Sequence, residues 1–388
     1  MNLTDLQEIV PPKKAEQIAQ NLVAWFGVYK RDLPWRGASP YAVWVSEIML
    51  QQTQVVTVIP FFLRFMERFP TVETLAETPI EEVLKYWAGL GYYARARNLH
   101  RAAQKVVVEY GGKIPTTPEE IEKLPGIGRY TAGAVLSIAY NVPRPLVDAN
   151  VIRVLSRLFG IEGDPKSSAN QALLWEVAGK LVPALNPGDF NQAMMELGAL
   201  VCQPAEPKCG ACPLYSLCVA GHLPDPSLLP QIPPGRSTIT LIHSSALVRN
   251  TEGEVLLVQR PLEGLWGGLW EFPRVTCAQG ETPQEGAERA GREVVGLPLE
   301  IGARVAKVKH AVTHHKITLY GFLAEPRHTT VDLTQSLVRD MRWVKPECLT
   351  DFALSSPQAL LRNALESFLV REVRGLSQPN LDFGIGET

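Results

Sequence analysis

The stretch LPGIGRYTAGAVLSIAYNVPRPLVDANVIRVL, from Leu124 to Leu155, predicts two helices, each opened by a distinctive turn. The first turn, LPGIG, places glycines where a backbone must turn tightly and can bring its N–H groups close to an anion. The helix that follows points its positive N-terminus toward the same place. With Leu124, Gly126 and Gly128, this hairpin can grip a DNA phosphate without reading sequence, although a glycine-rich turn is often only a turn.

The second turn carries Asp148. Val151, Val154, Leu155 and Leu158 follow it at helical spacing, so a helix begins close to Asp148. One interpretation makes Asp148 a helix N-cap, which is a common role for aspartate. The other makes it a carboxylate that the helix dipole and backbone amides keep ionised for chemistry. The two interpretations are compatible.

Outward from this stretch, residues 14–200 carry helix-length apolar periodicity separated by short Gly/Pro breaks. The predicted helices are Ala15–Tyr29, Pro40–Met66, Pro79–Trp87, Ala94–Tyr110, Thr117–Leu124, Tyr130–Tyr140, Asn150–Phe159 and Asn170–Leu181.

A proline-rich stretch then separates the helical part of the chain from a part with a different sequence pattern. HLPDPSLLPQIPPGR holds five prolines and predicts a stiff linker. Beyond it the sequence predicts an α+β domain, with strands Thr238–Val248, Val255–Gln259, Lys307–His310 and Lys316–Phe322 and helices Pro283–Val295 and Ser356–Arg371. The expected boundaries are 12–222 for the helical domain, 223–237 for the linker, 238–372 for the second domain and 373–388 for a flexible tail.

The composition is that of a multidomain globular protein. Of the 388 residues, 46% are hydrophobic and 20% are charged, which excludes collagen-like order and overall disorder. No run approaches the length of a membrane helix, and the N-terminus lacks a secretory profile, so we expect a cytoplasmic protein. The net charge of −2 gives no global signal for nucleic acid, so any DNA contact must be local.

One local excess of positive charge exists. Between Lys85 and Lys105 there are five basic residues and no acid, with four aromatic residues among them. This mixture suits phosphate contact and base stacking. It also suits a solvated helix face with buried aromatics.

Four of the six cysteines crowd together as C-x6-C-x2-C-x5-C, at Cys202, Cys209, Cys212 and Cys218. Without an export signal, disulfides are not expected, and the spacing points to a metal site. Zinc and a 4Fe–4S cluster both take four thiolates. The wide gaps favour iron–sulfur, but spacing alone does not decide.

Residues 14–218 resemble the helix–hairpin–helix DNA glycosylases that carry an iron–sulfur loop, and most closely the MutY-type adenine glycosylases. The resemblance rests on WVSEIMLQQTQV (44–55), GLGYYARARN (89–98), the hairpin, the Asp148 loop and the four cysteines. It implies an all-α glycosylase domain that binds duplex DNA, with one 4Fe–4S cluster on the four cysteines.

The resemblance also assigns the chemistry. Expelling adenine requires a proton on the base and a negative charge near the sugar cation, hence two carboxylates in opposite protonation states. Glu47 is implied as the general acid, and its apolar neighbours on a helix should raise its pKa. Asp148 is implied as the stabiliser or covalent trap of the sugar cation, kept charged by its helix N-terminus.

Further site residues follow from the same resemblance. Tyr130 stands where bifunctional relatives carry a lysine, and it cannot form a Schiff base. We expect it to donate a hydrogen bond beside Asn150, in a monofunctional enzyme. The base pocket is implied at Trp35 and Arg36. The wedge that fills the hole left by the extruded adenine is implied at Gln52 and Tyr92.

The second domain resembles the Nudix-like domain of these glycosylases, through GLWGGLWEFP (264–273) and Val312-Thr313-His314. The acidic pair that holds Mg²⁺ in a Nudix hydrolase is absent after Arg292-Glu293, so no Mg²⁺ requirement is expected. Thr313 and His314 match the turn that senses 8-oxoguanine, with Val312 replacing the family's phenylalanine. They can also be plain turn residues.

We therefore expect removal of adenine opposite 8-oxoguanine or guanine by a monomeric bacterial enzyme that acts at the nucleoid. The alternatives are a thymine or uracil mismatch glycosylase, a non-catalytic lesion-binding protein and a Nudix nucleotide hydrolase. The tail segment Gln378–Phe383 loosely resembles the peptides that dock on the replication sliding clamp, with Leu381 and Phe383 as anchors. Alternatively, these apolar residues pack back on the second domain.

Overall fold

The computed structural model describes residues 9–235, 237–264, 266–312, 314–327, 338–376 and 381–384. The chain separates into two compact units, each described by itself. The N-terminal unit holds residues 1–77 and 98–234, and the C-terminal unit holds residues 78–97 and 235–388. Among the described residues, no helix combines the length and the hydropathy that crossing a membrane requires.

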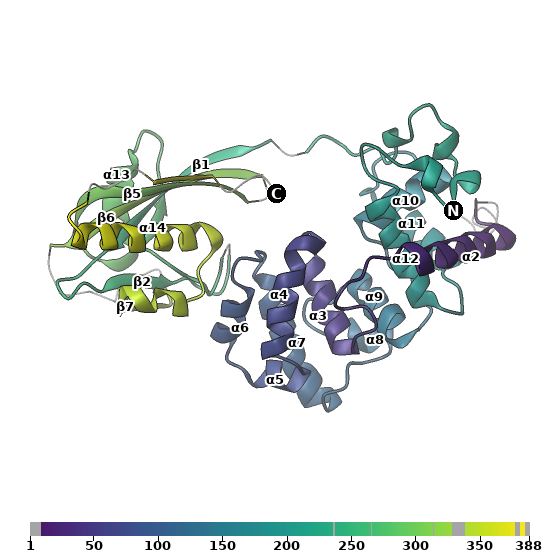
Figure 1. The fold of residues 1–388 in the computed structure, drawn as a ribbon, viewed down its shortest axis with the longest axis horizontal. Coiled ribbons are helices and arrows are strands. Elements are labelled where there is room, and N and C mark those ends of the chain that lie inside the picture. The colour runs from purple at the N-terminus through teal and green to yellow at the C-terminus, as the bar shows by residue number, and fades with distance from the viewer. Residues whose placement is uncertain are drawn as a thin grey trace. The chain divides into compact units, whose positions relative to one another are not determined.

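The N-terminal unit is helical (Figure 1). Its helices are α2 (Pro12–Tyr29), α3 (Pro40–Leu50), α4 (Val55–Arg68), α5 (Val72–Glu77), most of α7 (Ala94–Tyr110), α8 (Pro118–Ile121), α9 (Arg129–Tyr140), α10 (Ala149–Phe159), α11 (Ser168–Leu181) and α12 (Pro187–Leu200). Short 3₁₀ turns follow: η1 (Cys209–Ala211), η2 (Tyr215–Leu217), η3 (Ala220–His222) and η4 (Pro226–Leu228).

The predicted helix Pro40–Met66 is wrong as a single element. Helix α3 ends at Leu50 and α4 begins at Val55, and between them Gln52 adopts a left-handed backbone with φ of 56°. The Thr53 N–H donates to the Leu50 carbonyl at 3.2 Å, which closes a turn. The prediction also missed α5 and α12, and α8 is shorter than the predicted Thr117–Leu124.

Five of these helices pack around one hydrophobic core. Apolar residues of α2, α9, α10, α11 and α12 form this core, which includes Leu22, Leu155 and Leu197. Close helix contacts depend on small residues, because a Cβ on Gly133 would lie 2.1 Å from the Pro145 carbonyl oxygen. This packing brings α9, α10 and α12 close to one another and so positions the site.

The C-terminal unit is a mixed α/β body. Its elements are α6 (Ile80–Trp87), β1 (Ile239–Val248), β2 (Val255–Gln259), β3 (Trp270–Glu271), β4 (Arg274–Thr276), α13 (Pro283–Val295), β5 (Leu299–Val312), β6 (His315–Pro326), β7 (Asp340–Val344), η6 (Pro346–Asp351), α14 (Ser356–Val373) and β8 (Leu381–Gly384). One sheet has the order β4-β1-β6-β5-β8 and the other β3-β2-β7.

The larger sheet is covered on both faces. Helix α13 packs with Ala246 and Val248 of β1, whereas α14 packs with Leu247 of β1 and Val308 of β5 (Figure 1). Strands β5 and β6 form an antiparallel hairpin that closes at Val312 opposite His315, and β1 runs parallel to β6.

The expectation of a flexible tail over 373–388 is wrong for part of that range. Helix α14 continues to Val373, and Leu381–Gly384 form β8, which pairs in parallel with β5 at Ala306–Lys309. Alternating apolar residues explain the pairing, since Leu381 and Phe383 both pack against the core beside α14.

Candidate active site

Helix α3 carries Glu47 and determines its position. Ser39 caps this helix by accepting a hydrogen bond from the Ala42 N–H at 3.3 Å, and Pro40 occupies the first turn, where a missing N–H costs nothing. All residues from Tyr41 to Met49 are buried, so the helix has no exposed face on which a mid-helix carboxylate could lie. Glu47 is accordingly only 4% exposed.

The Glu47 carboxylate has one direct polar partner from α9. The hydroxyl of Tyr130 donates to Oε2 of Glu47 at 2.7 Å. Burial raises the pKa of Glu47 to about 7, the Tyr130 hydrogen bond opposes this rise and the charge of Asp148 adds to it. Tyr130 therefore donates its hydrogen bond to Glu47, in the pocket that Asn150 also lines. At neutral pH Glu47 can release a proton as readily as it holds one.

Asp148 is both a helix cap and a pocket residue. Its Oδ1 accepts from the Val151 N–H at 2.6 Å, and its Oδ2 accepts from Nδ2 of Asn150 at 3.0 Å. Burial nevertheless raises the pKa of Asp148 above its ordinary value, and those two hydrogen bonds only oppose the rise. The hydrogen bonds at the helix N-terminus favour the ionised form of Asp148, and burial in the pocket opposes them.

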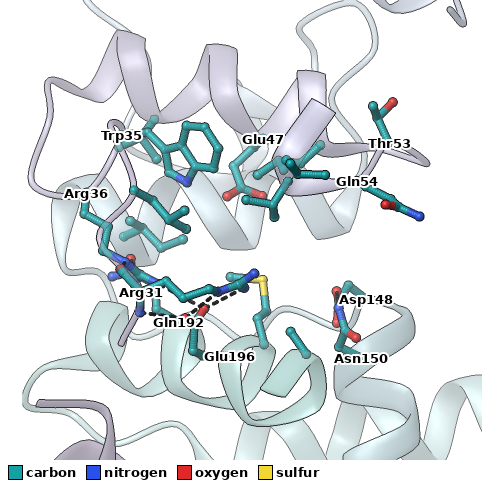
Figure 2. A pocket seen from close by; sticks show the side chains of 18 of the residues that line it. Arg31, Trp35, Arg36, Glu47, Thr53, Gln54, Asp148, Asn150, Gln192 and Glu196 are labelled. Carbon is teal, nitrogen blue, oxygen red and sulfur yellow. Dashed lines mark hydrogen bonds and ion pairs between the residues drawn. The ribbon is translucent and has the colours of Figure 1, made fainter. Parts of the chain in front are cut away.

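Both carboxylates line one pocket of about 440 Å³. Figure 2 shows Glu47 and Trp35 on one side of it and Gln192 and Glu196 on the opposite side. All six residues predicted for the catalytic centre and the base pocket line this cavity, namely Trp35, Arg36, Glu47, Tyr130, Asp148 and Asn150.

A charged network forms the wall opposite Glu47, and the sequence did not reveal it. Glu196 on α12 accepts from the Arg31 backbone N–H at 2.8 Å, from the Arg31 side chain at 2.8 and 2.9 Å, and from Arg36 at 3.0 Å. Arg36 also donates to Oε1 of Gln192 at 2.7 Å. Burial favours a higher pKa for Glu196, but the Arg31 hydrogen bonds and the charges of both arginines lower it overall.

The Asp148 loop is connected to the cysteine loop through Arg153. Its guanidinium donates to Oδ1 of Asn150 at 2.8 Å, to the Gly198 carbonyl at 2.8 Å and to the Cys202 carbonyl at 2.7 Å. Gly198 permits the close approach of α12 to α10, since an added Cβ would lie 2.6 Å from Cβ of Asn150. Helix α12 thus supports the pocket wall and the Asp148 loop together.

The four predicted cysteine ligands lie on one loop. The pKa of the Cys212 thiol is raised to about 11 by burial, against a Leu214 hydrogen bond, and the nearby Cys202, Cys218 and Cys209 raise it further. Several groups donate toward sulfur. The Leu214 N–H donates to Cys212 at 3.4 Å and Arg157 to Cys202 at 3.5 Å, and the backbone N–H groups of Ala220 and Gly221 donate to Cys218.

Within the described part of the chain, no three His, Cys, Asp or Glu side chains are grouped as for a single metal ion. Four neighbouring thiols with cationic and N–H donors fit a thiolate-bound cluster, since hydrogen bonds to the sulfurs tune such clusters. The two remaining cysteines, Cys277 and Cys348, lie in the C-terminal unit.

The predicted DNA-contacting residues lie on turns. Gln52 and Tyr92 both have left-handed backbones, with φ of 56° and 49°, which side chains other than Gly and Asn seldom adopt. In the hairpin, Leu124 is buried, Gly126 has φ of 78°, and Gly128 is the N-cap of α9. A Cβ on Gly126 would lie 2.6 Å from Cβ of Asn98, so this turn requires glycine.

His314, one of the two residues predicted to sense the lesion, lies at the β5–β6 hairpin. Val312 ends β5 and the rings of His314 and His315 lie 4.1 Å apart, whereas Thr313 falls outside the described residues. On α13, Arg289 pairs with Glu281 at 2.8 Å and with Glu293 at 2.9 Å. Glu293 is a carboxylate of α13, whereas Glu281 lies just before this helix.

The chain matches two family models. Residues 45–180 match the HhH-GPD superfamily of base excision DNA repair proteins, and residues 245–364 match the NUDIX domain.

Three relatives extend these matches. A rat adenine DNA glycosylase is 38% identical, over 93% of this chain and 80% of the rat protein. The adenine DNA glycosylase of Buchnera aphidicola subsp. Baizongia pistaciae is 38% identical over 66% of this chain and 73% of its own length. Among solved structures, a thermostable thymine-DNA glycosylase is 34% identical over 53% of this chain and 95% of its own, with a TM-score of 0.49.

Proposed function

This chain belongs to the adenine DNA glycosylase family, and from that premise we propose that it hydrolyses the N-glycosidic bond of adenine opposite 8-oxoguanine or guanine in duplex DNA. It is a DNA glycosylase with DNA as its partner. The observation that carries the proposal is the pair of carboxylates on one pocket, with the pKa of Glu47 raised to about 7. We place its action on chromosomal DNA.

Glu47 supplies the proton. Adenine leaves readily only when its ring is protonated, and an acid with a pKa near the working pH transfers a proton most effectively. The Tyr130 hydroxyl, at 2.7 Å, fixes the orientation of the Glu47 carboxyl group. Tyr130 has no amine, so it forms no Schiff base with the sugar, which supports base removal by water without strand cleavage.

Asp148 stabilises or traps the sugar cation. Its two hydrogen bonds from Val151 and Asn150 hold both carboxylate oxygens in place. Once the adenine is protonated and the sugar gains positive charge, that charge favours the ionised form of Asp148. Asn150 is positioned in turn by Arg153 at 2.8 Å.

The wall opposite Glu47 reads the base. Adenine presents an amino donor beside a ring-nitrogen acceptor. Arg31 and Arg36 offer donors and Gln192 and Glu196 offer acceptors on this wall. Trp35 lines the same pocket and provides an apolar surface for the extruded ring.

Gln52 and Tyr92 fill the space that the adenine vacates. Their left-handed backbones present side chains from tight turns, and Tyr92 is 46% exposed, as a wedge must be. The LPGIG hairpin grips a phosphate through its amides and the N-terminus of α9.

The β5–β6 hairpin recognises 8-oxoguanine through Thr313 and His314. We expect Thr313→Ala with His314→Ala to slow adenine removal opposite 8-oxoguanine more than opposite guanine. Equal slowing on both duplexes would assign this hairpin to general DNA binding or to folding.

Cys202, Cys209, Cys212 and Cys218 hold one 4Fe–4S cluster. Bound there, the cluster would fix the loop that contacts Arg153 and Arg157. Iron and sulfide analysis of the purified protein, together with its visible absorbance, tests this assignment. A fully active, colourless preparation that contains one zinc ion would contradict it.

We also propose that the tail segment Gln378–Phe383 docks on the sliding clamp. Residues 377–380 lie outside the described residues, but Leu381 and Phe383 are packed in β8. Docking would therefore require β8 to leave the sheet. A titration of the peptide 375–388 against a bacterial clamp, with and without Leu381→Ala and Phe383→Ala, tests this.

One assay distinguishes the main proposal from its alternatives. Purified protein is incubated with duplexes that hold adenine opposite 8-oxoguanine or guanine, or thymine opposite guanine, and alkali then reveals abasic sites. We expect cleavage at adenine in the first two duplexes. Cleavage at thymine would support a thymine glycosylase, and binding without cleavage would support a non-catalytic lesion binder.

A further inference from the structure

A second group of buried polar side chains lies on the five-stranded sheet of the C-terminal unit. His243 on β1 and His310 on β5 are 4% and 7% exposed. They share the face of Leu247 and Val308, because residues two or four apart on a strand point the same way. The indole of Trp266 lies near both imidazoles, with its ring centroid 6.5 Å from that of His243 and 5.9 Å from that of His310.

The backbone that carries this indole is strained. Trp266 has φ of 59°, a left-handed conformation that is unusual for an aromatic residue. Gly264 and Gly268 on either side also have positive φ, and a Cβ on Gly267 would lie 2.2 Å from the Leu262 carbonyl oxygen. A conformation kept against its energetic preference suggests a functional role for the residue that adopts it.

The surroundings of the two imidazoles are positively charged. The Arg274 guanidinium lies 5.2 Å from the Trp266 ring centroid, and its Nη1 lies 2.9 Å from Nδ1 of His243. Since arginine can only donate, Nδ1 of His243 accepts and the ring proton is assigned to Nε2. Glu271 accepts from both Arg260, at 2.6 Å, and Arg274, at 3.1 Å. Two guanidinium groups therefore share one carboxylate.

His310 lacks the hydrogen bonds that a buried imidazole normally makes. Neither ring nitrogen has a hydrogen-bond partner among the residues that the structure describes. A neutral imidazole carries one donor and one acceptor, and buried groups of this kind are nearly always satisfied. Burial and the charge of Arg274 lower the pKa of His310 to about 4, so the ring is neutral at pH 7. Arg274 would repel a metal cation at this place, whereas an anion would meet two donors.

We propose that Arg274, His310 and Trp266 form a binding site for a phosphate-class anion. The phosphate oxygens accept hydrogen bonds from the Arg274 guanidinium and from the His310 N–H, a charge-assisted arrangement that suits arginine. Because both ring nitrogens of His310 are buried and Trp266 is half-buried, the anion reaches them only if the indole rotates about its side-chain bonds. Free phosphate, a nucleotide phosphate and a phosphate of bound DNA all supply this chemistry.

The test uses the full-length protein labelled with ¹⁵N-histidine and titrated with inorganic phosphate at pH 7. We expect a saturable change in the His310 ring signals, together with a rise in the pH at which His310 titrates. His310→Phe keeps a planar ring without nitrogens and should weaken binding at least tenfold, with an unchanged or higher Tm. Arg274→Lys should also weaken phosphate binding. It replaces His310→Phe as the test variant if His310→Phe does not fold. Arg342→Gln is the control, because Arg342 stacks on Trp270 at 5.1 Å and is exposed.

Two further arms identify the source of the anion. If a DNA phosphate occupies the site, duplex should compete with phosphate, and His310→Phe should lower the salt dependence of duplex binding by about one phosphate contact. If a free anion occupies it, dGMP or phosphate binds without competition from duplex. The inference is overturned if the variants bind phosphate as the wild type does, or if neither phosphate binding nor a change in salt dependence is seen. Adenine release is a separate assay, so its failure leaves this test intact.

Discussion

Replacing Glu47 by glutamine is expected to stop base release and to stabilise the fold at alkaline pH. Burial raises the pKa of Glu47 from 4.5 to about 7, and at about 1.4 kcal/mol per pH unit, ionising it inside the fold costs about 3 kcal/mol. Below pH 4.5 the carboxyl group is protonated in both states and the cost is absent. The cost grows as the pH rises and is complete above about 7, because the unfolded chain then carries the charge more easily than the folded one. Glutamine keeps the shape and can accept the Tyr130 hydrogen bond, but it carries no charge.

The assay compares melting temperatures and base release at pH 5 and pH 8. We expect Glu47→Gln to raise the Tm at pH 8 by on the order of 5–10 °C and to change it little at pH 5. Release of adenine should fall by about 10²- to 10⁴-fold, the usual contribution of a general acid. Glu67→Gln, on the exposed face of α4, is the matched control. An equal gain in Tm at both pH values would refute the ionisation cost, and wild-type turnover would refute the acid role.

Three further substitutions test the same site. Asp148→Asn should abolish base release while the mispaired duplex still binds in a gel-shift titration, and wild-type turnover would contradict its role. Tyr130→Phe removes the hydrogen bond that lowers the pKa of Glu47, so the alkaline limb of the rate–pH profile should move above about 7; movement toward lower pH would contradict this. Gly198→Ala places a Cβ 2.6 Å from Cβ of Asn150 and should cost about 1–3 kcal/mol of stability, with slower single-turnover release; wild-type melting and turnover would show that this close approach is not required.

Apolar periodicity located most of the helices, because it reports the buried face on which each helix depends. The prediction failed where apolar residues continue at helical spacing across the break between two helices. The residues on either side of Gln51–Gln54 are apolar at helical spacing. The four polar residues between them include no Gly or Pro, so the turn at Gln52, with its φ of 56°, was not predicted. Strand β5 was predicted only at Lys307–His310, since its first half carries alternating exposed residues and register shifts near Arg304.

The two carboxylates that we propose as catalytic were predictable only through resemblance to a family. Periodicity alone describes Glu47 as a mid-helix charge, and its burial arises because every face of α3 is covered. The Arg31–Glu196 network was missed because α12 itself was not predicted. A local signal existed: Asn186-Pro187 opens a helix, and Gln192 and Glu196 stand four residues apart on one face of it. Their partners, Arg31 and Arg36, lie about 160 residues away, beyond any local pattern.

The pairing of β8 with β5 has a consequence for how the protein behaves at high concentration. Strand β5 lies at the edge of its sheet wherever β8 does not cover it, and an uncovered edge presents unpaired N–H and C=O groups. Removing Leu381–Gly384 would expose the backbone of Ala306–Lys309 and the apolar core residues on which Leu381 and Phe383 pack. Such a shortened protein would fold but associate edge to edge with its own copies, so its solubility, rather than its thermal stability, would limit storage and crystallisation.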